Sequence, residues 1–196
     1  MKISTQEMVL AALFTAIMCV LTILVRMFQP VFVIPFSLQP LVMLLAACLL
    51  SPRGVFLSMT AYLFLGLLGL PVFSAPPYGG PAYVLIPSFG FLLGFPLAGW
   101  LQSKLIKQTS LVNFTLAGLV AIITYYAIGL PYMYLILRFY LGNTLDIVQI
   151  LQIGLIPFIT FDLIKVVVAA SLALQLSRRL NINRELVANN FYRKDS

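Results

Sequence analysis

The sequence predicts an all-α membrane protein in which six transmembrane helices form one compact bundle, with the N-terminus and the C-terminus both cytoplasmic. Of its 196 residues, 62% are hydrophobic and 9% are charged, against roughly 25% charged in an ordinary soluble domain. Six apolar runs follow one another without a long polar segment between them, which favours a single domain. The basic residues, in turn, gather in alternate links between the runs.

A bilayer-crossing helix needs about 20 mainly apolar residues, and the six runs approach or exceed that length. We expect residues 1–196 to form one integral membrane domain with spans over 8–28, 33–50, 55–73, 83–103, 111–137 and 154–176, and a cytoplasmic tail over 178–196.

The distribution of bases sets the expected orientation. With the N-terminus inside, only Arg26 and Arg138 fall outside, which is the positive-inside rule in strong form. The bases expected in the cytoplasm are Lys2, Arg53, Lys104, Lys107, Arg178, Arg179, Arg184, Arg193 and Lys194.

The first run has a basic start but no small-x-small cleavage site before Arg26, so we interpret it as a mature helix and not as a signal peptide. Ala12 and Ala16 lie four residues apart within it, and small residues at this spacing let another helix approach closely. The spacing alone fits packing inside the bundle as well as docking of a partner.

The second run follows a link, 29–35, that carries two prolines and no charge. Gln39 is then a polar amide near the expected outer end of this helix, where it either forms an interhelical hydrogen bond or contacts a ligand. The turn Ser51-Pro52-Arg53-Gly54 is so short that the second and third helices must be antiparallel neighbours.

The third run ends in GLLGLPVF, and the loop that follows, 74–91, is rich in proline, glycine and aromatic residues. Such a loop is either a disordered connector or a lid over a partly apolar ligand. In the fourth run, Gly90, Gly94 and Gly99 indicate close helix packing and not a phosphate-binding loop, because the strand-turn-helix context is absent.

The fifth run contains Pro131 inside an apolar stretch. Its tyrosines at Tyr132, Tyr134 and Tyr140 fit an aromatic belt at the outer interface, close to Arg138.

The sixth run holds an acid and a base three residues apart, Asp162 and Lys165, which a helix places on one face. Ionisable side chains inside a membrane are costly and usually mark function. A bare buried ion pair stabilises a fold poorly, because desolvation can exceed the Coulomb gain, so ligand binding is favoured over a purely structural pair. Asp162 also follows a helix start marked by Pro157, where the helix dipole favours an anion.

Other chemistry is poorly supported. The chain has no histidine and five carboxylates, and Cys19 and Cys48 lie within apolar runs, which argues against a metal site or a disulfide framework. It has neither a nucleophile elbow nor a Walker motif, and its bases form no patch typical of nucleic-acid binding. We therefore expect a substrate-binding membrane subunit that is driven by other proteins, and no enzyme.

Four motifs occur together in the chain: PFSLQ at 35–39, GLLGLPVF at 66–73, PSFG at 87–90 and DLIK at 162–165. With GLPYMYLI at 129–136, they resemble the BioY family, the biotin-specific S components of energy-coupling factor transporters. The resemblance extends from Ala11 to Leu176. Thr160 and Phe161 stand directly before Asp162, where the family commonly has Pro-Gly.

The resemblance implies a six-helix bundle in the plasma membrane of a prokaryote, with biotin as the ligand and no cofactor. It implies that Ala12 and Ala16 dock a transmembrane coupling protein, which two ABC-type ATPase subunits would serve. An S component for another vitamin or small water-soluble compound remains the alternative. The substrate-binding residues it implies are Asp162, Lys165, Gln39, Tyr78, Tyr83, Ser88 and Phe89.

Overall fold

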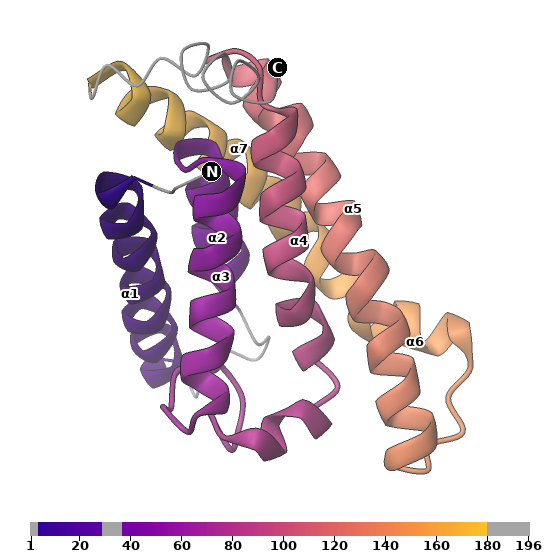
Figure 1. Ribbon diagram of the computed structural model, residues 1–196. Helices are drawn as coiled ribbons and strands as arrows, with labels where there is room; N and C mark the ends of the chain where they lie inside the picture. Colours follow the sequence, from indigo (N-terminus) through magenta and orange to yellow (C-terminus); the bar gives the residue numbers. More distant parts are fainter. Residues whose placement is uncertain (1–3, 29–36, 180–196) are drawn as a thin grey trace, which may run out of the picture.

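The computed structural model describes residues 4–28 and 37–179, and all regular secondary structure in this part of the chain is helical, without a strand (Figure 1). Its elements are α1 (Thr5–Phe28), α2 (Gln39–Leu49), α3 (Pro52–Leu67), the 3-10 helix η2 (Pro81–Leu85), α4 (Phe89–Leu105), α5 (Leu111–Leu135), the π-helical turn η3 (Ile136–Tyr140), α6 (Ile147–Gly154) and α7 (Ile156–Arg179).

Three of the described helices are long and apolar enough to cross a membrane: α1, α5 with its extension η3, and α7. The helices α2, α3 and α4 have 11, 16 and 17 residues, so they are shorter than the predicted spans. Residues 29–36, which include the predicted start of the second span, lie outside the described residues.

Proline and glycine residues lie at the ends of the shorter helices. Pro40 lies in the first turn of α2, a position that lacks an intrahelical N–H partner in any case. Beyond α3, Gly69 has a φ of 106°, in the region that favours glycine, and Pro71 follows. Before α4, the chain between Gly80 and Ser88 forms only the short 3-10 helix η2.

The helix α6 is an element that sequence reasoning missed, because residues 138–153 were expected to be a link. Asp146 caps it, accepting from the Gln149 backbone N–H at 2.8 Å while the Gln149 side chain accepts from the Asp146 N–H. This reciprocal arrangement is a capping box, built here with Asp and Gln. The helix packs on α5 and α7.

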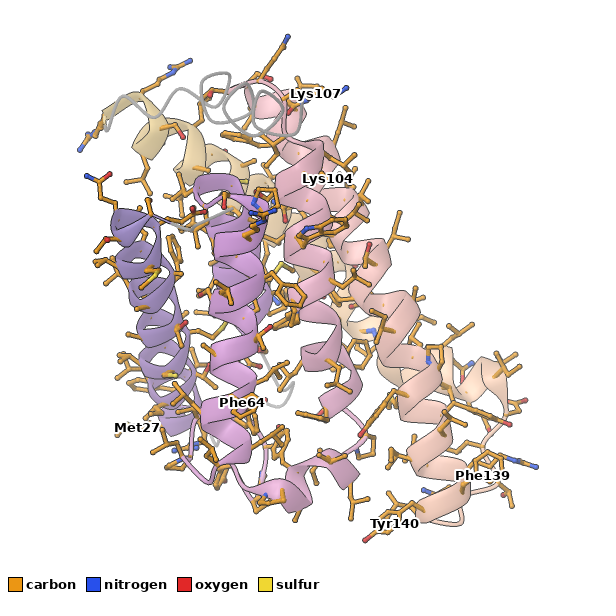
Figure 2. All side chains as sticks on the ribbon, viewed as in Figure 1. Met27, Phe64, Lys104, Lys107, Phe139 and Tyr140 are labelled. Atoms are coloured by element: carbon orange, nitrogen blue, oxygen red, sulfur yellow. The ribbon has the colours of Figure 1, made fainter. Side chains whose placement is uncertain are left out.

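The centre of the bundle is α2, which contacts α1, α3, α4, α5 and α7. Eight of its eleven residues are buried. Many apolar side chains instead face outward, among them Met27, Phe64 and Phe139 (Figure 2). Water would disfavour so much exposed apolar surface, whereas lipid accommodates it.

The two ends of the bundle differ in charge. The start of α1, the turn before α3, the end of α4 and the end of α7 lie at one end, where Lys104 and Lys107 project (Figures 1 and 2). Met27 lies at the other end, near the loop after α3, and Tyr140 lies at this same end, at the tip of η3. Of the bases predicted to be cytoplasmic, Lys2, Arg184, Arg193 and Lys194, with the tail after Arg179, lie outside the described residues.

Candidate functional site

A cavity of about 380 Å³ lies between α2, α4, α5, α7 and the loop that follows α3. Its size falls in the range of small-molecule sites, roughly 300–1,000 Å³. The cavity is lined by Ser37, Gln39, Pro40, Ser74, Ala75, Pro76, Tyr83, Ser88, Phe91, Leu92, Phe95, Tyr125, Tyr126, Gly154, Phe158, Asp162 and Lys165.

The acid and the base of α7 both face this cavity. Their spacing of three residues puts them on the buried side of the helix, and only 4% of Asp162 and 7% of Lys165 is exposed. The ammonium of Lys165 donates to Asp162 Oδ1 at 2.7 Å. The residues before them, Thr160 and Phe161, face outward and do not line the cavity.

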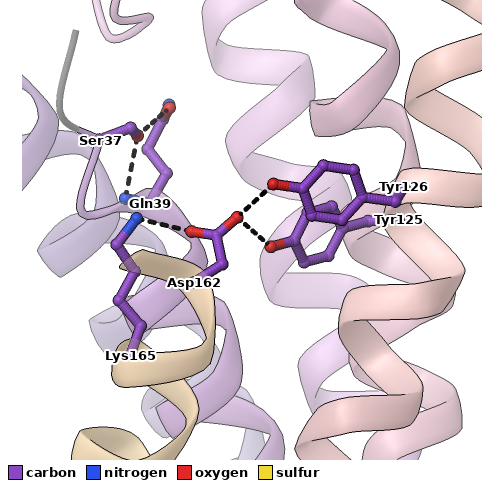
Figure 3. Close-up of polar contacts among 6 residues, drawn as sticks. All are labelled: Ser37, Gln39, Tyr125, Tyr126, Asp162 and Lys165. Atoms are coloured by element: carbon purple, nitrogen blue, oxygen red, sulfur yellow. Dashed lines mark hydrogen bonds and ion pairs between the residues drawn. The ribbon is translucent and has the colours of Figure 1, made fainter. Parts of the chain in front are cut away.

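Two tyrosines of α5 complete the surroundings of the carboxylate. The hydroxyls of Tyr125 and Tyr126 donate to Asp162 Oδ2 at 2.6 and 2.8 Å (Figure 3). Three donors therefore contact the two carboxylate oxygens, and hydrogen bonds of this kind offset much of the cost of burying a charge.

The helix dipole contributes less than the sequence suggested. Because α7 begins at Ile156, Asp162 lies beyond the first turn, and the effect of the dipole fades within that turn. Lys165 and the two tyrosine hydroxyls are the groups that hold the carboxylate.

A glycine allows the tyrosines to reach Asp162. A Cβ atom at Gly94 of α4 would lie 2.8 Å from the Cα atom of Tyr125, so any larger residue would push α5 away. The two tyrosine rings stack with centroids 4.9 Å apart. Phe95 and Phe91 of α4 then pack edge-on against Tyr125 and Tyr126. The glycines predicted to mark close packing in α4 do mark it, since a Cβ at Gly90 or Gly99 would clash as well.

Gln39 contributes to the cavity wall and to the packing of helices at once. Its amide nitrogen donates to the Tyr62 hydroxyl of α3 at 2.5 Å, and that hydroxyl donates to the Val72 carbonyl at 2.7 Å. Ser37 donates to the Gln39 amide oxygen at 2.9 Å (Figure 3). The interhelical bond is therefore present, and Gln39 also lies in the wall of the cavity.

The loop after α3 is ordered by its own contacts and forms one side of the cavity. The Phe73 N–H donates to the Tyr78 carbonyl at 2.8 Å, and the Gly80 N–H reaches back to the Gly66 carbonyl at 2.7 Å. Phe73 and Tyr83 are fully buried, with ring centroids 4.3 Å apart. The loop is thus packed in place, which argues against the disordered connector.

Two predicted site residues are absent from the cavity lining, Tyr78 and Phe89. The Arg26 guanidinium lies over the Tyr78 ring, 4.2 Å from its centroid, and donates to the Pro71 carbonyl at 2.9 Å. Phe89 is buried behind Tyr83, with their rings edge to face. Tyr83 and Ser88, in contrast, line the cavity with Asp162, Lys165 and Gln39.

The predicted docking pair lies on the surface of α1. Ala12 and Ala16 are exposed, whereas Ala11 and Thr15 face inward. The Thr15 hydroxyl lies 3.0 Å from the Ser58 carbonyl of α3. Packing inside the bundle therefore uses the offset pair Ala11 and Thr15 and leaves Ala12 and Ala16 available to a neighbour.

Sequence reasoning did not find the tyrosines that bind Asp162. A usable signal existed: Tyr125 and Tyr126 lie in the middle of the fifth apolar run, too far from either end for an interfacial belt. It also missed cavity residues that carry no pattern of their own, namely Ser37, Ser74, Phe91, Leu92, Phe95 and Phe158. Within the described ranges, no three His, Cys, Asp or Glu side chains gather to hold a metal ion.

Comparison with known proteins gives consistent results. A family model described as the BioY family matches residues 1–182. The probable biotin transporter BioY of Lysinibacillus sphaericus is 34% identical over 88% of this chain and 87% of its own. The biotin transporter BioY of Thermotoga maritima is 34% identical over 91% of this chain and 99% of its own. A crystal structure of the S component for biotin from an ECF-type ABC transporter matches with a TM-score of 0.72 at 21% identity, covering 90% of this chain and 95% of that one.

Proposed function

Because the chain belongs to the BioY family, we propose that it is the biotin-binding S component of an ECF-type transporter, a transport subunit and not an enzyme. It captures biotin from the outer side of the plasma membrane of a prokaryote. The observation that carries this proposal is the cavity of about 380 Å³, in which a buried acid–base pair faces aromatic walls.

The chemistry of the cavity suits biotin. The ligand offers two ureido N–H donors, a ureido carbonyl, an apolar thiophane ring with a valeryl chain, and a carboxylate. Phe91, Phe95 and Phe158 line apolar walls for the ring and chain. Gln39 and Ser37 add polar groups on the α2 side.

The Asp162 carboxylate retains one acceptor position for a ligand. A carboxylate has about four acceptor positions, and the Asp162 oxygens accept three hydrogen bonds, from Lys165, Tyr125 and Tyr126. A ureido N–H takes the remaining position on Oδ1. Lys165, with three donors, serves the ureido carbonyl or the ligand carboxylate.

The proposed topology has six spans, with both termini cytoplasmic. The described start of α1 and end of α7 lie at the same end of the bundle, which supports an even number of crossings (Figure 1). The segments that extend α3 and α4 beyond their short helices line the cavity or pack behind it, and irregular backbone at membrane depth is tolerated in such places. Labelling of a cysteine placed at Lys107 or at Arg138 from each side of the membrane would test the orientation, and labelling of both from the same side would refute it.

The proposed partners are a transmembrane coupling protein, which docks on Ala12 and Ala16, and two ABC-type ATPase subunits. The exposure of these alanines on α1 supports the docking site, because small residues allow a second helix to approach closely. The ATPases supply the energy for inward delivery.

Biotin binding by variants of the charged pair tests the proposed ligand. We expect Asp162→Asn or Lys165→Ala to abolish binding in detergent, because removal of one partner leaves the other buried without its counter-charge. Titration with labelled biotin measures the loss, and thermal unfolding without ligand checks that the fold persists.

The matched controls remove a carboxylate and an ammonium group that do not line the cavity. Asp146→Asn and Lys107→Ala should bind as the wild type does, since Asn caps a helix as well as Asp and Lys107 is exposed. Wild-type affinity in Asp162→Asn or Lys165→Ala would overturn the assignment. Stabilisation by another vitamin and not by biotin would transfer the site to that compound.

A further inference from the structure

A second concavity lies at the basic end of the bundle, between α3 and α4. This α3–α4 groove has a volume of about 450 Å³ and is lined by Arg53, Phe56, Leu57, Leu97 and Trp100. The residues belong to neither the cavity nor the α1 surface. Any ligand of this groove requires that the bundle lie in a bilayer, and it does not depend on which ligand the cavity binds.

The groove is polar at one end and apolar along its length. Arg53 lies at the start of α3, and Lys104 lies in the last turn of α4 with its ammonium 4.7 Å from the centroid of the Trp100 ring. Leu97 is seven residues before Lys104, which places it roughly 10 Å deeper at the rise of an α-helix. Phe56, Leu57 and Leu97 are each more than 40% exposed.

The charge at this end of the bundle selects the kind of occupant. Among the described residues, five bases gather here, Arg53, Lys104, Lys107, Arg178 and Arg179, against the single acid Glu7. Glu7 accepts from the Ser51 hydroxyl. A guanidinium has five N–H donors, so a single partner does not use all of them. Basic sites between helices on the cytoplasmic side suit anionic lipid head groups.

We propose that the α3–α4 groove binds an anionic phospholipid of the cytoplasmic leaflet. The phosphate of the lipid lies between Arg53 and Lys104, and an acyl chain runs along Phe56, Leu57 and Leu97. Trp100 lies beside the phosphate and glycerol region, the depth that tryptophan prefers in membranes.

The chain offers a direct readout, because Trp100 is its single tryptophan. The full chain is reconstituted in vesicles of dioleoylphosphatidylcholine with increasing fractions of brominated phosphatidylglycerol, or of brominated phosphatidylcholine in a parallel series. Bromine on the acyl chains quenches tryptophan on contact. We expect brominated phosphatidylglycerol to half-quench Trp100 at a mole fraction about fivefold lower than brominated phosphatidylcholine requires. The attraction of one base to an anionic membrane surface contributes about that factor.

The double variant Arg53→Gln, Lys104→Gln should quench equally with both lipids. The matched control Arg138→Gln, which removes an exposed base at the opposite end, should keep the preference. For each variant, the half-quenching mole fractions of the two lipids are compared as a ratio. This ratio cancels any change in fluorescence that comes from loss of the Lys104 contact with Trp100.

Equal quenching of the wild type by the two lipids, or a preference retained in the double variant, would overturn the proposal. Loss of the preference on addition of inorganic phosphate alone would make the groove a phosphate site and not a lipid site. Equal quenching, together with loss of co-purification of the coupling protein in the double variant, would assign the groove to a protein partner.

Discussion

Asp162 shows how a single residue depends on donors from two helices. Its carboxylate lies almost fully buried and contacts Lys165 of its own helix and the hydroxyls of Tyr125 and Tyr126 from α5. The pair is therefore a network of four side chains. Its energetic contributions are coupled, because each partner compensates the same buried charge.

Removal of the tyrosine hydroxyls should have a more than additive effect. We expect Tyr125→Phe or Tyr126→Phe to cost about 1.5–3 kcal/mol of stability, as for hydrogen bonds to charged groups. The double variant removes both tyrosine donors from Oδ2, so its loss of stability should exceed the sum of the two single losses, and biotin affinity should fall at least tenfold. Thermal unfolding and biotin titration form the double-mutant cycle.

Tyr140→Phe is the matched control, because Tyr140 is more than half exposed at the end of η3. It should change neither stability nor binding. A double variant with wild-type stability and affinity would contradict the role of the two hydroxyls.

Arg26 is a second residue whose role the contacts decide. By position it is one of two bases outside the membrane in the predicted topology. In the structure its guanidinium donates to the Pro71 and Phe73 carbonyls and stacks on Tyr78. It thus joins α1 to the loop that borders the cavity.

At the scale of elements, the approach of α4 to α5 sets the geometry of the site. Tyr125 sits against Gly94, and Gly129 of α5 similarly faces Phe91 of α4. Glycine is needed at Gly94 for close approach of backbones and not for its conformational freedom, because it lies within a regular helix. The distance between these helices determines whether the tyrosines reach α7.

Gly94→Ala should therefore impair the site from a distance. Its Cβ would meet the Tyr125 backbone, which cannot move without shifting α5, and overpacking of this kind costs about 1–3 kcal/mol. We expect a lower unfolding temperature and weaker biotin binding.

Gly118→Ala serves as the comparison, because the three atoms nearest to its Cβ would all belong to side chains, the first a methyl group of Val166 2.9 Å away. That variant should lose less stability and keep biotin binding. Unchanged biotin affinity in Gly94→Ala would show that α5 adapts without moving Tyr125.

At the scale of the whole molecule, the bundle separates its surfaces by function. The loop after α3, which lines the cavity, lies at the end opposite the basic residues, and the exposed alanines of α1 are not part of the lining. Ligand capture and docking of the coupling protein should therefore be separable by mutation.

Ala12→Trp combined with Ala16→Trp tests that separation. Two large side chains on the exposed face of α1 should block approach of a second helix, so the coupling protein should no longer co-purify. Biotin binding should stay at the wild-type level, because neither residue lines the cavity. Ile123→Trp, at a strongly exposed position of α5, is the control that should keep co-purification. Unchanged co-purification in the alanine variant would return these residues to a packing role.

The sequence by itself determined the class of the protein and the two charged residues at the centre of its candidate site. Composition requires a lipid environment, and the spacing of Asp162 and Lys165 requires a shared helix face, because both follow from local chemistry. The four motifs led to the family that the comparisons support.

Only the tertiary structure decided which side chains meet those two residues. The bonds from Tyr125 and Tyr126 to Asp162 join positions 37 and 36 residues apart, respectively, and the Gln39 bond to Tyr62 joins α2 to α3. The structure also gave helices shorter than the predicted spans. Proline and glycine residues end α3 before residue 73 and delay the start of α4 beyond residue 83. Periodicity records which face of a helix is buried, but the neighbour of that face depends on how closely two helices approach, and here a glycine at Gly94 sets that distance.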